Sequence, residues 1–290
     1  MPTETVYGLA ADAGNADAVA RIFAVKGRPT GHPLIVHGAS AAMLTDWVAA
    51  PPPAFDVLAA TCWPGPLTML VQRGRRVLDQ VTGTRPSVGV RVPAHPVATR
   101  LLEAFGSPVA APSANLFGHV SPTSAAHVLA DLGHLLDPGR DCVLDGGPAA
   151  VGVESTIVDL TVDPPQVLRA GAIDAPTIAR LLDTAVADAA GPSRAAGMLA
   201  AHYAPRTEVL LAESSEAAAD VLAGLVAAGR PARLLDRTGD LVVAARELYA
   251  DLRAADTDAL DALVVVLPPP QGLGIALRDR LTKAAAGSAR

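Results

Sequence analysis

The sequence is poor in cysteine, which excludes several kinds of site. Its 290 residues include two cysteines, Cys62 and Cys142, which lie far apart and form no CxxC motif. A zinc site or a framework of disulfides is therefore not expected, and a reduced cytoplasmic setting fits. No run of about eighteen apolar residues occurs, so we expect no membrane span. No charged-then-apolar leader opens the chain, so we expect no secretion.

The chain also lacks an excess of positive charge. Its net charge is −6, so the overall surface does not attract nucleic acid and any contact with a polyanion must be local. The densest basic cluster contains Arg73, Arg75, Arg76, Arg85 and Arg91.

Lysine and asparagine are scarce. Lysine occurs twice among the 23 basic residues, as Lys26 and Lys283, and Asn115 is one of two asparagines. Where arginine is the rule, a retained lysine indicates a position that needs a compact ammonium rather than a planar guanidinium. Chance retention is the alternative. Both Lys26 and Asn115 are therefore candidates for a function.

Familiar signatures of nucleotide-binding proteins and hydrolases are missing. The sequence contains no GxxxxGK[ST], no GxGxxG after a strand, no HExxH and no GxSxG. Any nucleotide chemistry must therefore use another phosphate-binding arrangement.

What is present is a mixed α/β pattern in two units. The first unit predicts helices over 17–25, 41–50, 54–63, 96–105, 123–132 and 176–182, and strands over 34–36, 67–71, 87–92, 108–111, 143–144, 155–160 and 166–168. In the second, strands at 208–211, 232–235 and 262–267 alternate with helices at 215–228, 242–252 and 275–286, which predicts a small parallel three-layer domain. A stretch rich in Ala, Gly, Pro and Ser separates them. We therefore predict domains at 1–185 and 207–290 and a linker at 186–206.

Hydroxyl and cationic side chains recur at the predicted strand ends and turns. Thr3 and Thr5 lie on a tight loop, and Lys26 and Arg28 flank a glycine after a helix. Each also has a simpler explanation, a capped turn for the threonines and a solvated helix end for the cations. His37 alone is more typical of a structural residue.

Further along the chain, Ser87 and Arg91 share one face of a strand, as do Ser113 and Asn115. Arg169 and the Glu154–Thr156 segment repeat the pattern of polar residues at a strand boundary. Together these residues predict a polar cleft in an open sheet, for an anionic small ligand that bears hydroxyl groups.

Five motifs in order resemble those of the YrdC-domain proteins. They are Pro2-Thr3-Glu4-Thr5-Val6-Tyr7-Gly8-Leu9, Lys26-Gly27-Arg28-Pro29, Pro33-Leu34-Ile35-Val36-His37, Pro112-Ser113-Ala114-Asn115 and Glu154-Ser155-Thr156-Ile157-Val158-Asp159. With His202-Tyr203-Ala204-Pro205, the chain resembles the long form of the threonylcarbamoyl-AMP synthases. This resemblance implies a YrdC-like twisted open mixed sheet followed by a Rossmann-like C-terminal domain.

The resemblance also implies a reaction in the cytoplasm. L-threonine, bicarbonate and ATP with Mg²⁺ give threonylcarbamoyl-AMP and pyrophosphate. A threonylcarbamoyl-transfer complex then modifies an adenosine beside the anticodon of tRNA, so contact with tRNA or double-stranded RNA is a further expectation.

Site residues follow by position in the motifs. The resemblance implies that threonine is held by Thr5, His37, Arg91, the Ala111 backbone and Ser155, and ATP by Arg28, His32, Ser87, Ser113, Ser121, Arg169 and Tyr203. Lys26, Arg28 and Asn115 would be the catalytic residues, and no residue would bind a metal directly. Because Tyr203 lies in the linker, that linker is expected to act as a lid over ATP.

The chain departs from the family pattern in three places. His32 replaces an asparagine, and Ala195-Ala196 replaces Ser-Pro before Gly197. The helix and strand that precede the Pro2–Thr5 loop in the family have no counterpart, for which a late start assignment or a truncation is the expected reason.

Two other functions compete with the synthase. A hydrogenase-maturation carbamoyltransferase carries a similar domain, together with cysteine zinc motifs and an acylphosphatase-like region that this chain lacks. A non-catalytic RNA-binding module would use the Arg73–Arg91 cluster. The acidic net charge and the intact Lys26, Arg28, Ser113 and Asn115 favour the enzyme.

Overall fold

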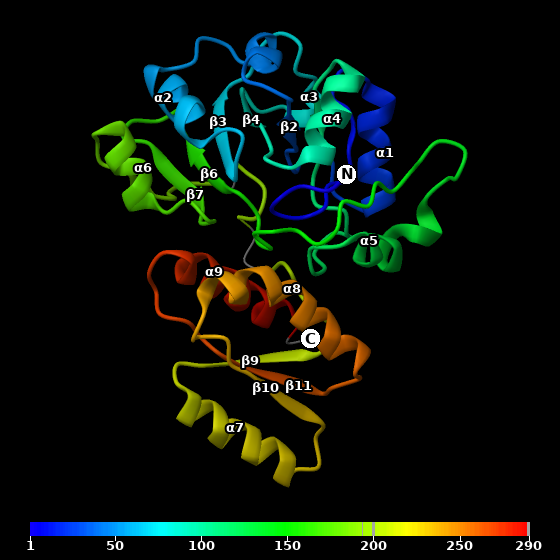
Figure 1. Ribbon diagram of the computed structural model, residues 1–290, viewed down its shortest axis with the longest axis vertical. Helices are drawn as coiled ribbons and strands as arrows, with labels where there is room; N and C mark the ends of the chain where they lie inside the picture. Colours follow the sequence, from blue (N-terminus) through cyan, green and yellow to red (C-terminus); the bar gives the residue numbers. More distant parts are fainter. Residues whose placement is uncertain (193, 199–200, 289–290) are drawn as a thin grey trace.

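The protein consists of two α/β units that lie one above the other along its long axis (Figure 1). The structure, a computed structural model, describes residues 1–192, 194–198 and 201–288. No helix among these residues is long and apolar enough to cross a membrane.

The first unit is built on a mixed eight-stranded sheet in the order β1-β5-β2-β4-β3-β6-β7-β8. Its strands are β1 Ala11–Asp12, β2 Ile35–His37, β3 Leu67–Gln72, β4 Ser87–Arg91, β5 Val109–Ala110, β6 Thr156–Asp159, β7 Gln166–Arg169 and β8 Ala187–Asp188. Its helices are α1 Ala16–Lys26, α2 Pro53–Cys62, α3 Asp79–Thr82, α4 Pro96–Phe105, α5 Ala125–Leu132 and α6 Ala175–Leu182, with short 3₁₀ turns η1 Ala42–Trp47 and η2 Gly133–Leu135.

Strand β4 lies inside the sheet and is buried along its whole length. It runs parallel to β2 and antiparallel to β3, and the register with β2 sets His37 beside Arg91. Strand β6 runs parallel to β3, which brings the residues just before Thr156 to the same region. The topology therefore gathers polar residues from separate motifs at one edge of the sheet.

Capping groups fix the ends of α1 and thereby place two cations. The Asn15 side chain accepts hydrogen bonds from the backbone N–H groups of Asp17 and Ala18 at the helix start. Gly27 ends the helix in the left-handed conformation, with φ of 59°. Lys26 is therefore the last helical residue, and Arg28 follows the turn.

Most predicted elements are present, with two corrections in the first unit. The segment 143–144 is not a strand, because it pairs with no neighbour and Val143 instead packs on the cluster around Tyr7 and Val128. Within 41–50 the helix is a 3₁₀ turn confined to η1. Two short strands were not predicted: β1, and β8, which lies in the 186–206 segment and pairs with β7.

The second unit matches the predicted small parallel domain. Its elements are β9 Glu208–Ala212, α7 Ser215–Ala227, β10 Ala232–Leu235, α8 Leu241–Thr257, β11 Ala262–Val266 and α9 Leu273–Ser288, and its sheet has the order β10-β11-β9 with all strands parallel. Figure 1 shows α7 on the outer face of this sheet and α8 and α9 between the sheet and the first unit.

The two units touch through closely packed backbone and a partly buried ion pair. Arg253 of α8 forms an ion pair at 2.6 Å with Asp131 of α5. A side chain at Gly152 would place its Cβ 2.3 Å from the carbonyl oxygen of Ala245 in α8. Helix α8 therefore lies directly against the segment that precedes β6.

Candidate active site

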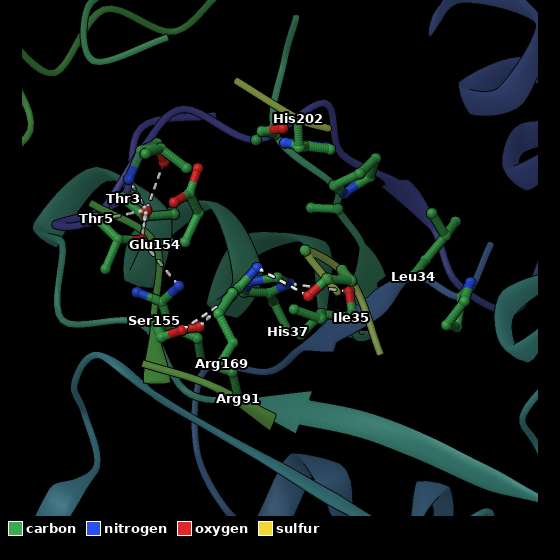
Figure 2. Close-up of a pocket in the computed structure, with 18 of the residues that line it drawn as sticks. Thr3, Thr5, Leu34, Ile35, His37, Arg91, Glu154, Ser155, Arg169 and His202 are labelled. Atoms are coloured by element: carbon green, nitrogen blue, oxygen red, sulfur yellow. Dashed lines mark hydrogen bonds between the residues drawn. The ribbon is translucent and has the colours of Figure 1, made fainter. Parts of the chain in front are cut away.

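A hollow of about 650 Å³, partly open to solvent, lies where the motif loops meet the linker. Of the predicted site residues, Thr5, Arg28, His37, Arg91, Ala111, Ser113, Ser155, Arg169 and Tyr203 line it. Figure 2 shows the labelled Thr5, Arg91, Ser155 and Arg169 side chains around it. The linker supplies one wall through Gly197, His202 and Tyr203.

One side of the hollow is organised by Arg91, which is 4% exposed at the end of β4. Its Nη1 donates to the Thr5 hydroxyl at 2.9 Å and its Nε to the Gly65 carbonyl at 3.2 Å. Its Nη2 lies 2.7 Å from Oε1 of Glu4, which forms a buried ion pair. Arg91 is therefore held in one orientation with its charge balanced from within the loop.

The Pro2–Thr5 loop is closed by Thr3 rather than by Thr5. The Thr3 hydroxyl donates to the carbonyl of Val6 at 2.6 Å and accepts from the backbone N–H groups of Thr5 and Val6. The capped-turn explanation thus holds for Thr3 and leaves the Thr5 hydroxyl directed at Arg91.

His37 is a neutral imidazole with a defined tautomer. Burial, with the nearby charge of Arg91, lowers its pKa to about 3. Its Nδ1 lies 3.1 Å from the Ile35 carbonyl, which can only accept, so Nδ1 carries the proton. Nε2 is then left as a hydrogen-bond acceptor.

A second cationic side is built on Ser155 and Arg169. Arg169 donates from Nε to the Ser155 carbonyl at 2.9 Å and from Nη2 to the Ser155 hydroxyl at 3.0 Å. The Thr68 hydroxyl lies 2.7 Å from the same hydroxyl. The Ser155 hydroxyl therefore has two hydrogen-bond partners, and among the described residues no base accepts its proton.

Arg28 extends this cationic side. It donates to the carbonyl oxygens of His32 and Pro33 at 3.4 and 3.0 Å, and its guanidinium lies 5.5 Å from the centre of the Phe117 ring. Burial lowers its pKa to about 10, so the side chain is still a cation at neutral pH.

Lys26 and Asn115 lie behind the hollow instead of lining it. Lys26 Nζ donates to the carbonyl oxygens of Ser113, at 2.6 Å, and of Asn115. The Asn115 amide donates to the carbonyls of Leu116 and His119 at 2.8 and 2.7 Å. Burial holds the pKa of Lys26 well below its usual range. The two scarce residues brace the loop that carries Ser113.

Three residues predicted to hold ATP do not line the hollow either. The His32 ring packs 5.2 Å from the Phe117 ring, and Ser87 is buried in β4 opposite Gln72. The Ser121 hydroxyl donates to the Glu154 carboxylate at 2.6 Å.

The sequence places Glu154 in the polar cleft but assigns it no role. It lines the hollow, and its carboxylate also accepts from Tyr249 of α8 at 2.7 Å and Arg280 of α9 at 3.0 Å. Burial favours a raised pKa, but the charges of Arg280 and Arg169 and the two hydroxyl donors outweigh it and lower the pKa to about 2. Its place before Ser155 in a strand-boundary motif was the only sequence signal.

His202 and Tyr203 close the hollow from the linker. Their rings are 4.1 Å apart, and Tyr203 stacks at 5.6 Å on Tyr249. Tyr203 adopts a positive φ of 62°, a strained conformation for a non-glycine residue. Burial lowers the pKa of His202 to about 3, so this imidazole is neutral.

Known proteins match this chain over both of its units. A family described as "Telomere recombination" matches residues 1–171, and one described as "Threonylcarbamoyl-AMP synthase, C-terminal domain" matches residues 173–286. A threonylcarbamoyl-AMP synthase of Pyrococcus abyssi is 36% identical over 98% of this chain and 89% of its own length. The chain belongs to the threonylcarbamoyl-AMP synthase family.

Another member of this family, from Bacillus subtilis, is 36% identical over 99% of this chain and 89% of its own length. The crystal structure of P. abyssi Sua5 complexed with L-threonine superposes with a TM-score of 0.92, over 99% of this chain and 90% of that one. The predicted family and fold class are thereby confirmed. The individual ligand roles assigned to side chains stay predictions.

Proposed function

We propose that this protein is an L-threonylcarbamoyladenylate synthase, which forms threonylcarbamoyl-AMP and pyrophosphate from L-threonine, bicarbonate and ATP. The observation that carries this function is one hollow lined by three buried arginines, Arg91 with its neighbour Thr5 and the pair Arg28 and Arg169. An amino acid carboxylate and a triphosphate each need such a partner. The names of the relatives support the same reaction.

Arg91 is the proposed partner of the threonine carboxylate. Its guanidinium already points at the Thr5 hydroxyl, and the Nε2 acceptor of His37 is available for the ammonium or the hydroxyl of threonine. The Ala111 backbone and Ser155 line the same region. Because the guanidinium is held by Gly65 and Glu4, little reorganisation is needed when threonine binds.

Arg28 and Arg169 are the proposed partners of the phosphates of ATP. Each is almost fully buried, so its charge acts in a region of low dielectric constant. Glu154 is the only carboxylate among the described residues that line the hollow, and it already accepts three hydrogen bonds. None of the described residues that line the hollow is therefore proposed to bind Mg²⁺ directly, and the ion would arrive on the phosphate oxygens.

The reaction we propose needs no covalent enzyme intermediate. The free amine of threonine forms a carbamate, either with carbon dioxide, which releases a proton to solvent, or with bicarbonate, which releases water. A carbamate oxygen then attacks the α-phosphorus as pyrophosphate leaves. Among the described residues of the hollow, no hydroxyl is paired with a base in the manner of an activated nucleophile. Catalysis would then come from positioning and charge stabilisation.

The decisive assay incubates the protein with ATP, labelled threonine and bicarbonate. We expect pyrophosphate and a threonylcarbamoyl adenylate, both dependent on threonine and on bicarbonate. Arg28→Ala should nearly abolish the product, whereas Arg206→Ala, which changes an exposed arginine paired with Asp256, should leave it intact. Full activity of Arg28→Ala would contradict the assignment of the phosphate side.

The RNA-binding alternative finds little support in the basic cluster. Arg73 pairs with Asp79, Arg76 lies 3.5 Å from Asp46, and Arg91 points into the hollow. Much of the predicted positive surface is therefore neutralised or buried. As part of the same proposal, the adenylate passes to a tRNA threonylcarbamoyl-transfer complex in the cytoplasm.

A further inference from the structure

The carboxylate of Glu154 joins the wall of the hollow to the second unit. One of its oxygens accepts from Ser121 of the first unit, and the other accepts from Tyr249 and Arg280 of the second. Glu154 and Arg280 are 126 positions apart in the chain. This contact therefore depends entirely on how α9 is seated.

Arg280 is placed for orientation more than for stability. Its side chain is 0% exposed, and Nη1 donates to Asp279 at 2.6 Å while the guanidinium lies 5.4 Å from the centre of the Tyr203 ring. Its Nη2 is buried and has no hydrogen-bond partner among the described residues. Buried ion pairs often contribute little net stability, and an unsatisfied donor is costly.

The same helix also holds the linker. Lys283 Nζ donates to the Gly197 carbonyl at 2.7 Å and pairs with Asp279 at 2.7 Å. Gly197 lines the hollow, where an added Cβ would lie 2.8 Å from Cδ of Arg169. One face of α9 thus reaches Glu154, Tyr203 and Gly197, three parts of one wall.

We propose that Arg280 is a positioning residue for ATP, acting through Glu154 and Tyr203. This inference rests on the function proposed above. Arg280 does not line the hollow, so it acts without touching the ligand. Of the residues predicted to hold ATP, Ser121 donates to the carboxylate that Arg280 neutralises, and Arg169 and Tyr203 interact with it electrostatically.

The physical reason is charge balance beside a polyanion. An ionised Glu154 on the wall repels a triphosphate unless a fixed cation compensates it. Arg280 supplies that cation from the second unit and fixes the Tyr203 ring at the same time. The second unit is therefore part of the ATP side of the site, whereas the Arg91 side is built from the first unit alone.

The test measures ATP and threonine dissociation constants separately on the full chain by calorimetry. Arg280→Met is expected to raise the Kd for ATP about ten-fold or more and the Kd for threonine less than about three-fold. Adding Glu154→Gln removes the uncompensated charge and should restore most of the ATP affinity. Arg280→Lys, which keeps the cation, should give a Kd for ATP between those of the wild-type protein and Arg280→Met.

Arg278→Met is the matched control. Arg278 lies on the same helix but pairs with Glu213 and the Pro268 carbonyl within the second unit. Both dissociation constants should stay at the wild-type values in this variant. If Arg280→Met does not fold, Tyr249→Phe removes a single donor to Glu154, and a Kd for ATP raised about three-fold with unchanged threonine affinity is then expected.

Three results would overturn the proposal. The first is unchanged ATP affinity in Arg280→Met, or in Tyr249→Phe where that variant replaces it. The second is an equal loss of ATP and threonine affinity. The third is a double variant, Glu154→Gln/Arg280→Met, that regains no ATP affinity. The failure of the proposed function looks different, because the wild-type protein would then bind neither ligand, or bind both without forming the adenylate. Binding of neither ligand overturns both proposals, whereas normal wild-type turnover with an unaffected variant overturns only this one.

Discussion

Replacing Arg91 by methionine tests how the hollow is built, because it removes the charge while keeping much of the volume. Arg91 and Glu4 form an ion pair at 2.7 Å, and their side chains are 5% and 9% exposed. Removing one partner of a buried pair leaves the other charge uncompensated, which costs about 3–5 kcal/mol of stability. We expect the free energy of unfolding of Arg91→Met to fall by about that amount.

A second substitution separates stability from binding. In Glu4→Gln/Arg91→Met neither charge remains, so at least about half of the lost stability should return. Threonine affinity should not return, because the guanidinium proposed to donate to the threonine carboxylate is still absent. Hydrogen bonds to charged groups contribute about 1.5–3 kcal/mol, so we expect the Kd for threonine to rise roughly 10- to 150-fold in both variants.

Urea unfolding followed by circular dichroism gives the stabilities, and calorimetric titration gives the Kd for threonine. Glu4→Gln alone is the control for the loss of the loop carboxylate. If the double variant binds threonine with the wild-type Kd, Arg91 is not the carboxylate partner, and the assignment of this side of the hollow is wrong.

Three further predictions concern the framework. Lys26→Met leaves the Ser113 and Asn115 carbonyls without their donor, so the free energy of unfolding in denaturant should fall by about 2–4 kcal/mol. Lys26→Arg should not restore that stability if the position requires a compact ammonium. The pKa values of His37 and His202 are both lowered to about 3 in the folded protein, so below pH 6.5 the unfolded chain binds protons that the folded chain does not. The free energy of unfolding should therefore fall by roughly 2–3 kcal/mol per histidine as the pH drops from about 6.5 to 4.5. His37→Asn and His202→Asn should each flatten this slope, and an unchanged slope would contradict the burial of a neutral ring. Gly152→Ala should lower the free energy of unfolding by more than about 3 kcal/mol, because the added Cβ meets the α8 backbone. Gly147→Ala, which is also at positive φ but in open space, should lower it by about 1–2 kcal/mol. Equal losses in thermal unfolding would contradict the tight contact between the units.

The parts of the fold that the sequence predicts are those with a strong local signal. Helix α4 has Pro96 at its start and Gly106 at its end, and its predicted and observed bounds agree. Strands β1 and β8 are two residues long, so they carry no period that a pattern could reveal. The apolar pair at 143–144 predicts a strand that does not form, because a local apolar pattern does not distinguish strand pairing from core packing.

The site residues also differ in how far the sequence predicts them. Arg91 could be placed at a cleft because it lies near the end of a predicted strand, whereas Thr5 and His37 were assigned to the site by the resemblance to the YrdC-domain proteins. The scarcity of Lys26 and Asn115 marked a real constraint, but it reflects a buried brace and not contact with the hollow. Glu154 and Arg280 could not be paired from sequence, since their contact depends on the docking of two separate units.

The central claim is that one hollow joins threonine, bicarbonate and ATP. The most direct measurement supplies bicarbonate with a heavy carbon isotope and analyses the product by mass spectrometry, with pyrophosphate counted in parallel. We predict that the heavy carbon lies between the threonine nitrogen and the adenylate, with one pyrophosphate released per product. Pyrophosphate released without threonine, or an adenylate that lacks the heavy carbon, would contradict the account.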